Sequence, residues 1–499
     1  MKLLNKIFKS CILYLMLTIS LYWFIVCAAK CTGITYTAYF AIALLICSFI
    51  IFNKNLKRVC FKILKHKKII FVVMIIFQFL ILLSSKIMIR SDAAAVFLSA
   101  TGQRSKEALS NYLSFNPNNL FLFFYEKFFY SIFGKNCIWV LQILNIIYLD
   151  LFIIITSIIS NKYLDDKNSI FFYLALAIIG FSAQFVAMYT DIMILPIASI
   201  LLLINLKIMN TQNIKQNVLW GILLGFVSGI GILIRATILV LEIAFYSICL
   251  LTKRYKQLVS IIPFIILTIL LYTVINNIFM NSDSIYFVKN VGKNYLSFID
   301  LGLTESGTDQ IDFENSLAGF YDPLSGKNNN GCDNRYTKEV VLQDINRRLN
   351  NYNFRTFNRH LLYKSAYIFE DGTLGWAYTD NQIDYYMNPL YEKIKDNKYF
   401  TFIRNSFIYV NEKEYSNLKF FENIVMCIIV FGIIYSIKSE LLLKNNNDIY
   451  YFLLLSIFGG ILFLMIFEGG KARYLIQFLP QILLVSSIGL NNIIEKANK

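Results

Sequence analysis

Histidine and charged residues are scarce in this sequence of 499 residues. Only two histidines occur, His66 and His360, and their isolation excludes the paired spacing of zinc ligands. Charged residues make up 16% of the chain and hydrophobic residues 57%, a balance that no soluble class of protein has. Apolar runs near the length that spans a bilayer recur along the chain. The sequence therefore predicts a membrane protein with many transmembrane helices.

Several signatures of soluble enzymes are also missing. The polar region 281–417 contains no GxSxG, P-loop or GxGxxG motif, so hydrolase, nucleotide and dinucleotide chemistry has no local support. Most of the nine cysteines lie in apolar runs and only Cys332 lies in the polar region, which indicates neither a disulfide framework nor a zinc site. The net charge of +16 reflects lysines in short loops between apolar runs. That is the positive-inside pattern of membrane proteins, and it argues against nucleic acid as a partner.

The apolar runs divide the chain into four parts. Residues 1–68 are expected to form a transmembrane hairpin and a basic cytoplasmic loop, and 69–280 a transmembrane core with an outer loop at 90–136. Residues 281–417 are expected to form a small mixed extracytoplasmic domain, and 418–499 the C-terminal transmembrane helices. Twelve transmembrane helices are predicted, at 11–29, 36–52, 69–89, 137–159, 170–188, 192–208, 217–234, 237–252, 258–280, 419–437, 449–467 and 474–490.

Helical spacing of apolar residues is also present inside the polar region. Val341, Leu342, Ile345 and Leu349 predict one helix there. A second helix, with a mixed face, is predicted around residues 357–368.

The segment 117–133 decides the topology. Asn116 and Pro117 form a good helix start, but the helix that follows measures about 24 Å against a hydrocarbon core of about 30 Å. It also carries Glu126 and Lys127 in its middle. If it does not cross the membrane, every short basic loop falls on the cytoplasmic side, as the positive-inside rule requires. We therefore predict an interfacial helix and cytoplasmic termini, with lipid-facing side chains at Leu120, Phe121, Phe124, Phe128 and Ile132.

This topology gathers charged side chains on the outer face. Two acids, Asp92 and Asp191, lie at helix ends there, where an ionised side chain is costly unless it faces water or a site. Three bases, Arg235, Lys471 and Arg473, lie on the same side. Each charge also has a simpler explanation. Asp191 can end a helix, Arg235 can pair with a structural carboxylate, and the other two bases can snorkel to lipid headgroups.

The order of these features carries a resemblance to a known family. It consists of the acid in Arg90-Ser91-Asp92, a proline-started helix that ends at Phe133-Gly134, the second acid Asp191, and the late loop from Glu468 to Tyr474. Together they resemble the GT-C superfamily of membrane glycosyltransferases, which includes protein O-mannosyltransferases and bacterial aminoarabinose transferases. The similarity covers most of residues 86–490. Ile345 to Leu349, followed by Lys364 and by Asp371 to Trp376, looks like an uncharacterised Gram-positive branch of that superfamily.

The resemblance implies a mainly α GT-C type fold and a polyprenyl-phosphate sugar donor. Transfer would occur on the outer face of a Gram-positive plasma membrane, to a wall polysaccharide, teichoic acid, lipid or protein. Asp92 corresponds to the general base or acceptor-orienting carboxylate of the family, and Asp191 to its second-loop acid. Two departures weaken a metal site: Ala93 follows Asp92, and Asn116-Pro117-Asn118 replaces a His-Pro-Pro type sequence. A divalent metal is therefore left open, and no cofactor is assigned.

The chemistry of such a transfer calls for the same residue types. One carboxylate must take the proton of the acceptor hydroxyl, and cations must stabilise the departing phosphate. Asp92 is the expected base, and the donor phosphate is expected to bind Arg235, Lys471 and Arg473. Positioning of the acceptor or of the loops is expected from Asn116, Asn118, Asn119, Glu468 and Tyr474.

Three other functions share some of these features. A polysaccharide polymerase has the same substrate class, many helices and one large outer loop. A lipid-linked glycan transporter or flippase needs charges deep within several helices, whereas only Asp150 and Glu242 lie in the middle of apolar runs here, which favours a one-sided enzyme. A structural membrane scaffold is the third alternative. The sugar and the acceptor are left open by the sequence.

Overall fold

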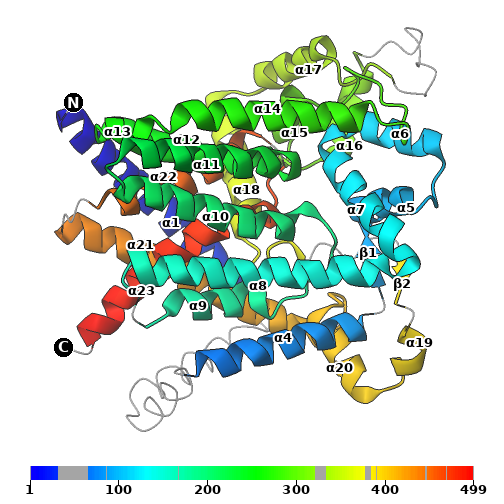
Figure 1. The fold of residues 1–499 in the computed structure, drawn as a ribbon, viewed down its shortest axis with the longest axis horizontal. Coiled ribbons are helices and arrows are strands. Elements are labelled where there is room, and N and C mark those ends of the chain that lie inside the picture. Colours follow the sequence, from blue (N-terminus) through cyan, green and yellow to red (C-terminus); the bar gives the residue numbers. More distant parts are fainter. Residues whose placement is uncertain are drawn as a thin grey trace.

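Long helices lie side by side as a bundle, and many of the shorter elements gather at one end of it (Figure 1). The computed structural model describes residues 2–31, 66–85, 87–166, 168–320, 333–376, 384–388, 390–443, 447–467 and 469–497. The predicted helix 36–52 and the predicted site residue Glu468 lie outside these ranges.

Nine helical stretches of the described residues are long and apolar enough to cross a membrane. Two shorter apolar stretches, Ile170–Gly180 and Ala236–Leu251, occur where further spans were predicted. The chain is thus a mainly helical, polytopic membrane protein, and the total of twelve spans stays a prediction. The elements of the bundle are α1 (Lys2–Cys31), α4 (Lys67–Ser84), α8 (Cys137–Tyr163), α9 (Ile170–Ala175), η3 (Leu176–Gly180), η4 (Gln184–Val186), α10 (Thr190–Asn210), α11 (Ile214–Ile234), η5 (Ala236–Ile238), α12 (Leu239–Leu251), α13 (Tyr255–Leu258), α14 (Ile261–Met280), α21 (Tyr415–Leu443), α22 (Asp448–Ile466), η8 (Ala472–Phe478) and α23 (Leu479–Ala497).

Both chain termini lie at one end of the bundle, and α5, α7, β1 and β2 lie at the other (Figure 1). The two strands pair antiparallel, with Ile87 opposite Met387. The predicted outer loop 90–136 is therefore at the end away from the termini, while the identity of that end as the outer face stays a prediction. The remaining elements are β1 (Ile87–Arg90), α5 (Ser91–Ala100), α6 (Lys106–Phe115), η1 (Pro117–Asn119), α7 (Leu120–Phe133), η2 (Gly134–Asn136), α15 (Tyr295–Gly302), α16 (Gln310–Ala318), α17 (Lys338–Asn351), α18 (Phe354–Phe369), β2 (Asp384–Met387), α19 (Tyr391–Ile394) and α20 (Lys398–Phe407).

The end that holds the termini is tied together by one carboxylate. Asp448, in the first turn of α22, pairs with Lys9 of α1 at 3.0 Å and with Arg254 at 2.7 Å. Arg254 also donates through Nη1 to the carbonyl oxygen of Met209 in α10 at 2.9 Å. Helix ends that are far apart in sequence are therefore brought together here.

Helix α7 lies at the opposite end and is too short to span a membrane by itself. Its 14 residues measure about 21 Å, and Gly134, with φ of +53°, ends it before α8. Phe128 and Ile132 are exposed, as predicted. The prediction that Leu120 faces lipid is wrong because that side chain is buried. Phe124 is half-buried and stacks on Phe279 of α14, with ring centroids 4.4 Å apart, since the end of α14 packs against this side of α7.

Small residues let the helices α11 and α14 pack closely against each other. A Cβ atom at Gly221 would lie 2.5 Å from the carbonyl oxygen of Ser260, and one at Gly225 would lie 2.8 Å from that of Phe264. Glycines four residues apart lie on one face of a helix and let two backbones approach, as in many membrane helix pairs. This contact fixes the position of the end of α11, which carries Arg235.

The region between α14 and α21 packs in two different ways. Helices α15, α16 and α17 share a small apolar core with members such as Phe313 and Val341. Helix α18 instead packs on α1, where the rings of Phe369 and Trp23 stack with centroids 4.7 Å apart. The two helices predicted in this region from apolar spacing are confirmed as α17 and α18.

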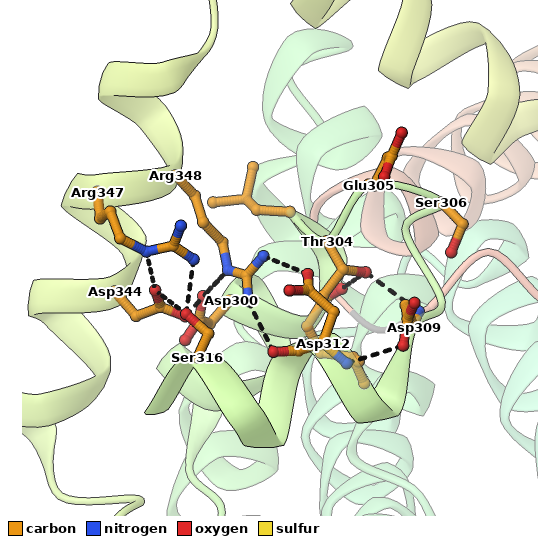
Figure 2. Close-up of polar contacts among 12 residues, drawn as sticks. Asp300, Thr304, Glu305, Ser306, Asp309, Asp312, Ser316, Asp344, Arg347 and Arg348 are labelled. Atoms are coloured by element: carbon orange, nitrogen blue, oxygen red, sulfur yellow. Dashed lines mark hydrogen bonds and ion pairs between the residues drawn. The ribbon is translucent and has the colours of Figure 1, made fainter. Parts of the chain in front are cut away.

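A buried ionic cluster joins α15, α16 and α17 (Figure 2). Arg348 Nε lies 3.0 Å from Asp300 and 3.0 Å from Asp344, and its Nη1 lies 2.7 Å from Asp312. Arg347 also pairs with Asp344 at 2.7 Å. Arg348, Asp300 and Asp344 are almost fully buried, so the ion pairs among them replace the contacts with water that each charge has lost.

Candidate functional site

Asp191, in the first turn of α10, forms an ion pair with an arginine from the next long helix. Arg235 Nη2 lies 2.5 Å from Asp191 Oδ1, and Arg235 Nε donates to the hydroxyl of Thr190 at 3.0 Å. Arg235 directly follows the last residue of α11. Both charged side chains are nearly buried, so each replaces contacts that the other has lost with water. The simpler explanation for Arg235, that it pairs with a carboxylate, is confirmed, and that carboxylate is itself a predicted site residue.

Arg473 approaches the same carboxylate from η8. Its Nε lies 3.7 Å from Asp191 Oδ2 and has no hydrogen-bond partner among the described residues. The guanidinium carbon lies 5.4 Å from the ring centroid of Tyr189 and 5.5 Å from that of Tyr474, within the range of a cation–π contact. One third of the side chain is exposed. Arg473 is therefore held in place, and part of its side chain stays accessible.

A loop after α18 supports the backbone of Arg473. Gly375 has φ of +85°, and a Cβ atom there would lie 2.7 Å from the Cβ atom of Arg473. Asp371 shapes this loop, because its carboxylate accepts from the backbone N–H of Thr373 at 3.0 Å and of Gly375 at 2.8 Å. The Gln184 amide donates to the Thr373 carbonyl oxygen at 2.9 Å. The sequence singled out this loop only through the resemblance, so its supporting role was missed.

Hydrogen bonds connect the cluster to η1 and α6. The Tyr189 hydroxyl donates to Asn119 Oδ1 at 3.2 Å, and Asn119 Nδ2 donates to the Tyr112 hydroxyl at 2.8 Å. Burial raises the pKa of Tyr189 to about 12, and Asp92 adds to the rise. The phenol of Tyr189 therefore stays protonated at neutral pH and remains a hydrogen-bond donor.

Asp92 lies in the first turn of α5 and is exposed. It is near enough to Tyr112, Tyr189 and Arg473 to interact electrostatically with each of them. No hydrogen bond or ion pair joins its carboxylate to the described part of the chain. Asp92 is therefore the carboxylate of the cluster that remains open to a substrate, whereas Asp191 is bound to its arginine.

Three of the remaining predicted residues, Asn116, Asn118 and Lys471, lie within three positions of Asn119 or Arg473 in the sequence. Lys471 is exposed and precedes η8. Asn118 is exposed in η1, and the amide of Asn116 donates to the Tyr112 carbonyl oxygen at 3.1 Å. Glu468 lies outside the described residues. The cluster is thus formed by the two predicted acids, the two arginines, Asn119 and Tyr474.

Lys364 of α18 is a buried cation beside the segment that leads from α22 to Arg473. Its Nζ donates to the carbonyl oxygens of Gly302 at 3.1 Å and Met465 at 3.0 Å. Gly307 and Gly470 close over its stem, since a Cβ atom at either position would lie within 3.0 Å of a Lys364 side-chain carbon. Lys364 thereby fixes the chain that leads from α22 to Arg473. The sequence singled out Lys364 only through the resemblance, without this role.

The cluster does not fit a resident divalent metal ion. Among the described residues, no group of three or more His, Cys, Asp or Glu side chains is placed to hold one. Divalent cations in proteins take several oxygen ligands, and one of the two acids here is already paired with Arg235. An anion is the better match for the Arg473 side of the cluster, because Asp191 is already neutralised by Arg235.

The bundle and this cluster define a polytopic integral membrane protein with a charged site at the end opposite its termini. Over residues 1–494 the chain matches the family described as conserved hypothetical integral membrane protein, and it belongs to that family. No curated protein and no solved structure matches the chain.

Proposed function

We propose that this protein is a GT-C type glycosyltransferase that moves a sugar from a polyprenyl-phosphate donor to a cell-surface acceptor on the outer face of the plasma membrane. The observation that carries the proposal is the convergence of Arg235 and Arg473 on Asp191, with the exposed Asp92 in electrostatic reach of Arg473. An anion-binding arginine next to a free carboxylate is the pair of groups that such a transfer requires.

The donor phosphate is assigned to Arg473. Arg235 uses both Nε and Nη2 within the protein, and its side chain is 12% exposed. The Arg473 side chain is 33% exposed, so the accessible part of its planar guanidinium can bind phosphate oxygens. A polyprenyl phosphate presents its phosphate near the headgroup plane, which is where a site at the end of a membrane bundle lies.

The reaction assigns a different task to each acid. Asp92 takes the proton of the acceptor hydroxyl while the hydroxyl oxygen forms a bond to the anomeric carbon of the sugar. The bond from that carbon to the phosphate oxygen breaks, and its electron pair stays with the polyprenyl phosphate, whose added negative charge Arg473 stabilises. Asp191 is a positioning residue, because it holds Arg235 and lies beside Arg473.

The proposal is tested with purified protein in lipid vesicles that contain polyprenyl-phosphate sugars labelled in the sugar. We expect the label to move to a water-soluble or acceptor-bound product, with release of free polyprenyl phosphate, relative to protein-free vesicles. Stepwise growth of the product would identify a polysaccharide polymerase, which repeats the same sugar transfer on one acceptor. Passage of intact labelled lipid between leaflets without release of polyprenyl phosphate would contradict the transferase and indicate a flippase.

A further inference from the structure

A pocket of about 340 Å³ opens between α6, α16 and the segments that precede α15 and α17. Its volume falls within the range of small-molecule sites, about 300–1,000 Å³. The amides of Asn111 and Asn116 line it on the α6 side, with the rings of Phe115 and Tyr336 beside them. The two rings meet edge to face, with centroids 5.6 Å apart. The pocket thus combines hydrogen-bonding amides with aromatic surface.

The walls of this pocket are fixed by backbone hydrogen bonds. The hydroxyls of Ser110 and Ser114 on α6 accept from the N–H groups of Tyr286 at 2.8 Å and Val288 at 3.0 Å. The N–H of Lys293 donates to the carbonyl oxygen of Phe115 at 2.9 Å. These bonds attach the segment before α15 to α6. The pocket is therefore formed before any ligand arrives, which lowers the conformational entropy cost of binding.

The charges that line the pocket are balanced. Arg335 is held by Asp333, with Nη2 2.7 Å from Oδ2, and Lys293 lies 5.4 Å from the ring centroid of Tyr336. Glu314 Oε1 accepts from the Tyr336 hydroxyl at 3.5 Å. Two cations thus face two carboxylates, a balance that gives a phosphate-rich polymer no net attraction. A neutral sugar suits it better, because each hydroxyl can both donate and accept.

Helix α6 connects this pocket to the charged cluster. Asn111 and Phe115 line the pocket, while the hydroxyl of Tyr112 accepts from Asn119 in the cluster. Asn116 also lines the pocket and directly precedes η1, which holds Asn119. A saccharide held in the pocket would therefore be separated from the reacting centre by one helix and one turn.

We infer that this pocket binds a neutral saccharide unit of the acceptor. This inference rests on the proposed function for its link to transfer, whereas the binding itself does not depend on it. The acceptor would then be a glycan longer than the single hydroxyl-bearing unit that reacts, with one unit held in the pocket and another reaching Asp92.

The test is binding of neutral disaccharides to the full chain in lipid nanodiscs, followed by saturation-transfer NMR titration. Maltose, cellobiose, lactose and diacetylchitobiose serve as probes, and inorganic phosphate and glycerol phosphate as anionic comparisons. We expect at least one disaccharide to bind, and to bind at least tenfold more weakly to Glu314→Gln and to Asn111→Asp. Glu339→Gln is the matched control, because Glu339 is exposed on α17 and does not line the pocket.

The inference is overturned if no disaccharide binds, if both pocket variants bind as the wild type does, or if an anionic probe binds more tightly than every sugar. Thermal unfolding of each variant shows whether a loss reflects misfolding, and the two variants lie on different elements, so both would have to misfold for that explanation to hold. Disaccharide binding without any donor consumption would reject the transferase and keep the pocket. Donor consumption without disaccharide binding would reject the saccharide pocket and keep the transferase.

Discussion

Asp191 lies between two arginines that differ in exposure, and this difference separates their tasks. The Arg235 side chain is 12% exposed and that of Arg473 is 33% exposed. A buried arginine with two bonded donors mainly holds structure, whereas a partly exposed one can exchange water for a ligand. Asp92 is exposed next to them and pairs with neither. Conservative substitutions at these positions can therefore distinguish a general base, a phosphate ligand and a positioning residue.

Asp92→Asn is expected to lower transfer by about 10²–10⁴-fold, because the amide keeps the shape of the side chain but cannot accept the acceptor's proton. Asp191→Asn should lower it less. The measurement is the turnover of labelled donor in vesicles, with Asp283→Asn, an exposed acid away from the cluster, as the control. Near-normal turnover of Asp92→Asn would remove the general-base role.

Arg473→Lys is expected to reduce the turnover rate by about 10–100-fold with little change in the apparent affinity for the donor, since charge develops on the phosphate in the transition state. Lysine cannot reproduce the bidentate geometry of arginine. Arg235→Lys loses one of two donor contacts in a buried pair, so it should lower the thermal unfolding temperature as well as the turnover. If both lysine variants keep wild-type turnover, the arginines are anchors and the donor binds elsewhere.

Among the elements, the pair α11 and α14 shows how a helix contact sets the site. Arg235 follows α11 directly, and the glycine face of α11 lets α14 approach it closely. A wider separation would move Arg235 relative to Asp191, which belongs to α10. The site is therefore expected to be sensitive to substitutions that touch none of its residues.

Gly225→Ala should destabilise the protein by about 1–3 kcal/mol, because its Cβ would lie 2.8 Å from the carbonyl oxygen of Phe264 and the helices must separate. The measurement is thermal unfolding in detergent together with donor turnover, and both should fall. Gly319→Ala is the matched control, because the position is exposed and its Cβ would meet a single atom of the described residues, at 3.2 Å. Equal stability of the two variants would show that α11 and α14 can move apart with no loss of stability.

The ionic cluster of α15 to α17 predicts a pH dependence. Burial, and then the nearby Asp344, raises the pKa of Asp300 to about 7, against the opposing effect of Arg348. The folded state therefore binds a proton between about pH 4 and pH 7 that the unfolded chain releases, so stability is present at the lower pH and is lost as the pH rises through 7.

We expect the opening free energy of α15 and α17, measured by hydrogen exchange with correction for the intrinsic rate, to fall by about 2–3 kcal/mol from pH 5 to pH 8. Asp300→Asn should remove most of that fall. Glu339→Gln, an exposed acid on α17, should leave it unchanged. A fall of the same size in Asp300→Asn would assign the pH dependence to another group.

At the scale of the whole molecule, the termini and the charged cluster lie at opposite ends of the bundle (Figure 1). Asp448 ties the N-terminal helix to α13 and α22 at one end, and α5 and α7 lie at the other. The proposed donor arrives on a lipid, so the end with Asp92 must be the outer face if the proposal is right. Sidedness is therefore a test of function as well as of topology.

Cysteines introduced at two exposed positions test this sidedness. Glu339→Cys on α17 should react with a membrane-impermeant thiol reagent in intact cells, whereas Lys215→Cys at the start of α11 should react only after the cells are opened. Labelling is measured relative to the wild type, which carries its own nine cysteines. The opposite pattern would place the cluster in the cytoplasm and reject the proposed donor.

The sequence by itself determined the class of the molecule and most of its helices. An apolar run long enough to cross a bilayer is stable mainly as a transmembrane helix, so it predicts a span without knowledge of the helices that pack beside it. Helical spacing was enough to predict α17 and α18, and Gly134 ends α7 where the sequence placed the end of the segment. The predicted acids and arginines also lie together, because helix ends on one side of a bundle are confined to one surface.

Only the tertiary structure decided which side chains meet there. The pairing of Asp191 with Arg235 joins positions 44 residues apart, and the contact of Gly375 with Arg473 joins two separate loops. Periodicity describes the faces of one helix and does not say which neighbour covers a face, which is why the burial of Leu120 was missed. The pocket beside α6 was invisible for the same reason, since α6, α16 and the segments before α15 and α17 form its walls from distant parts of the chain.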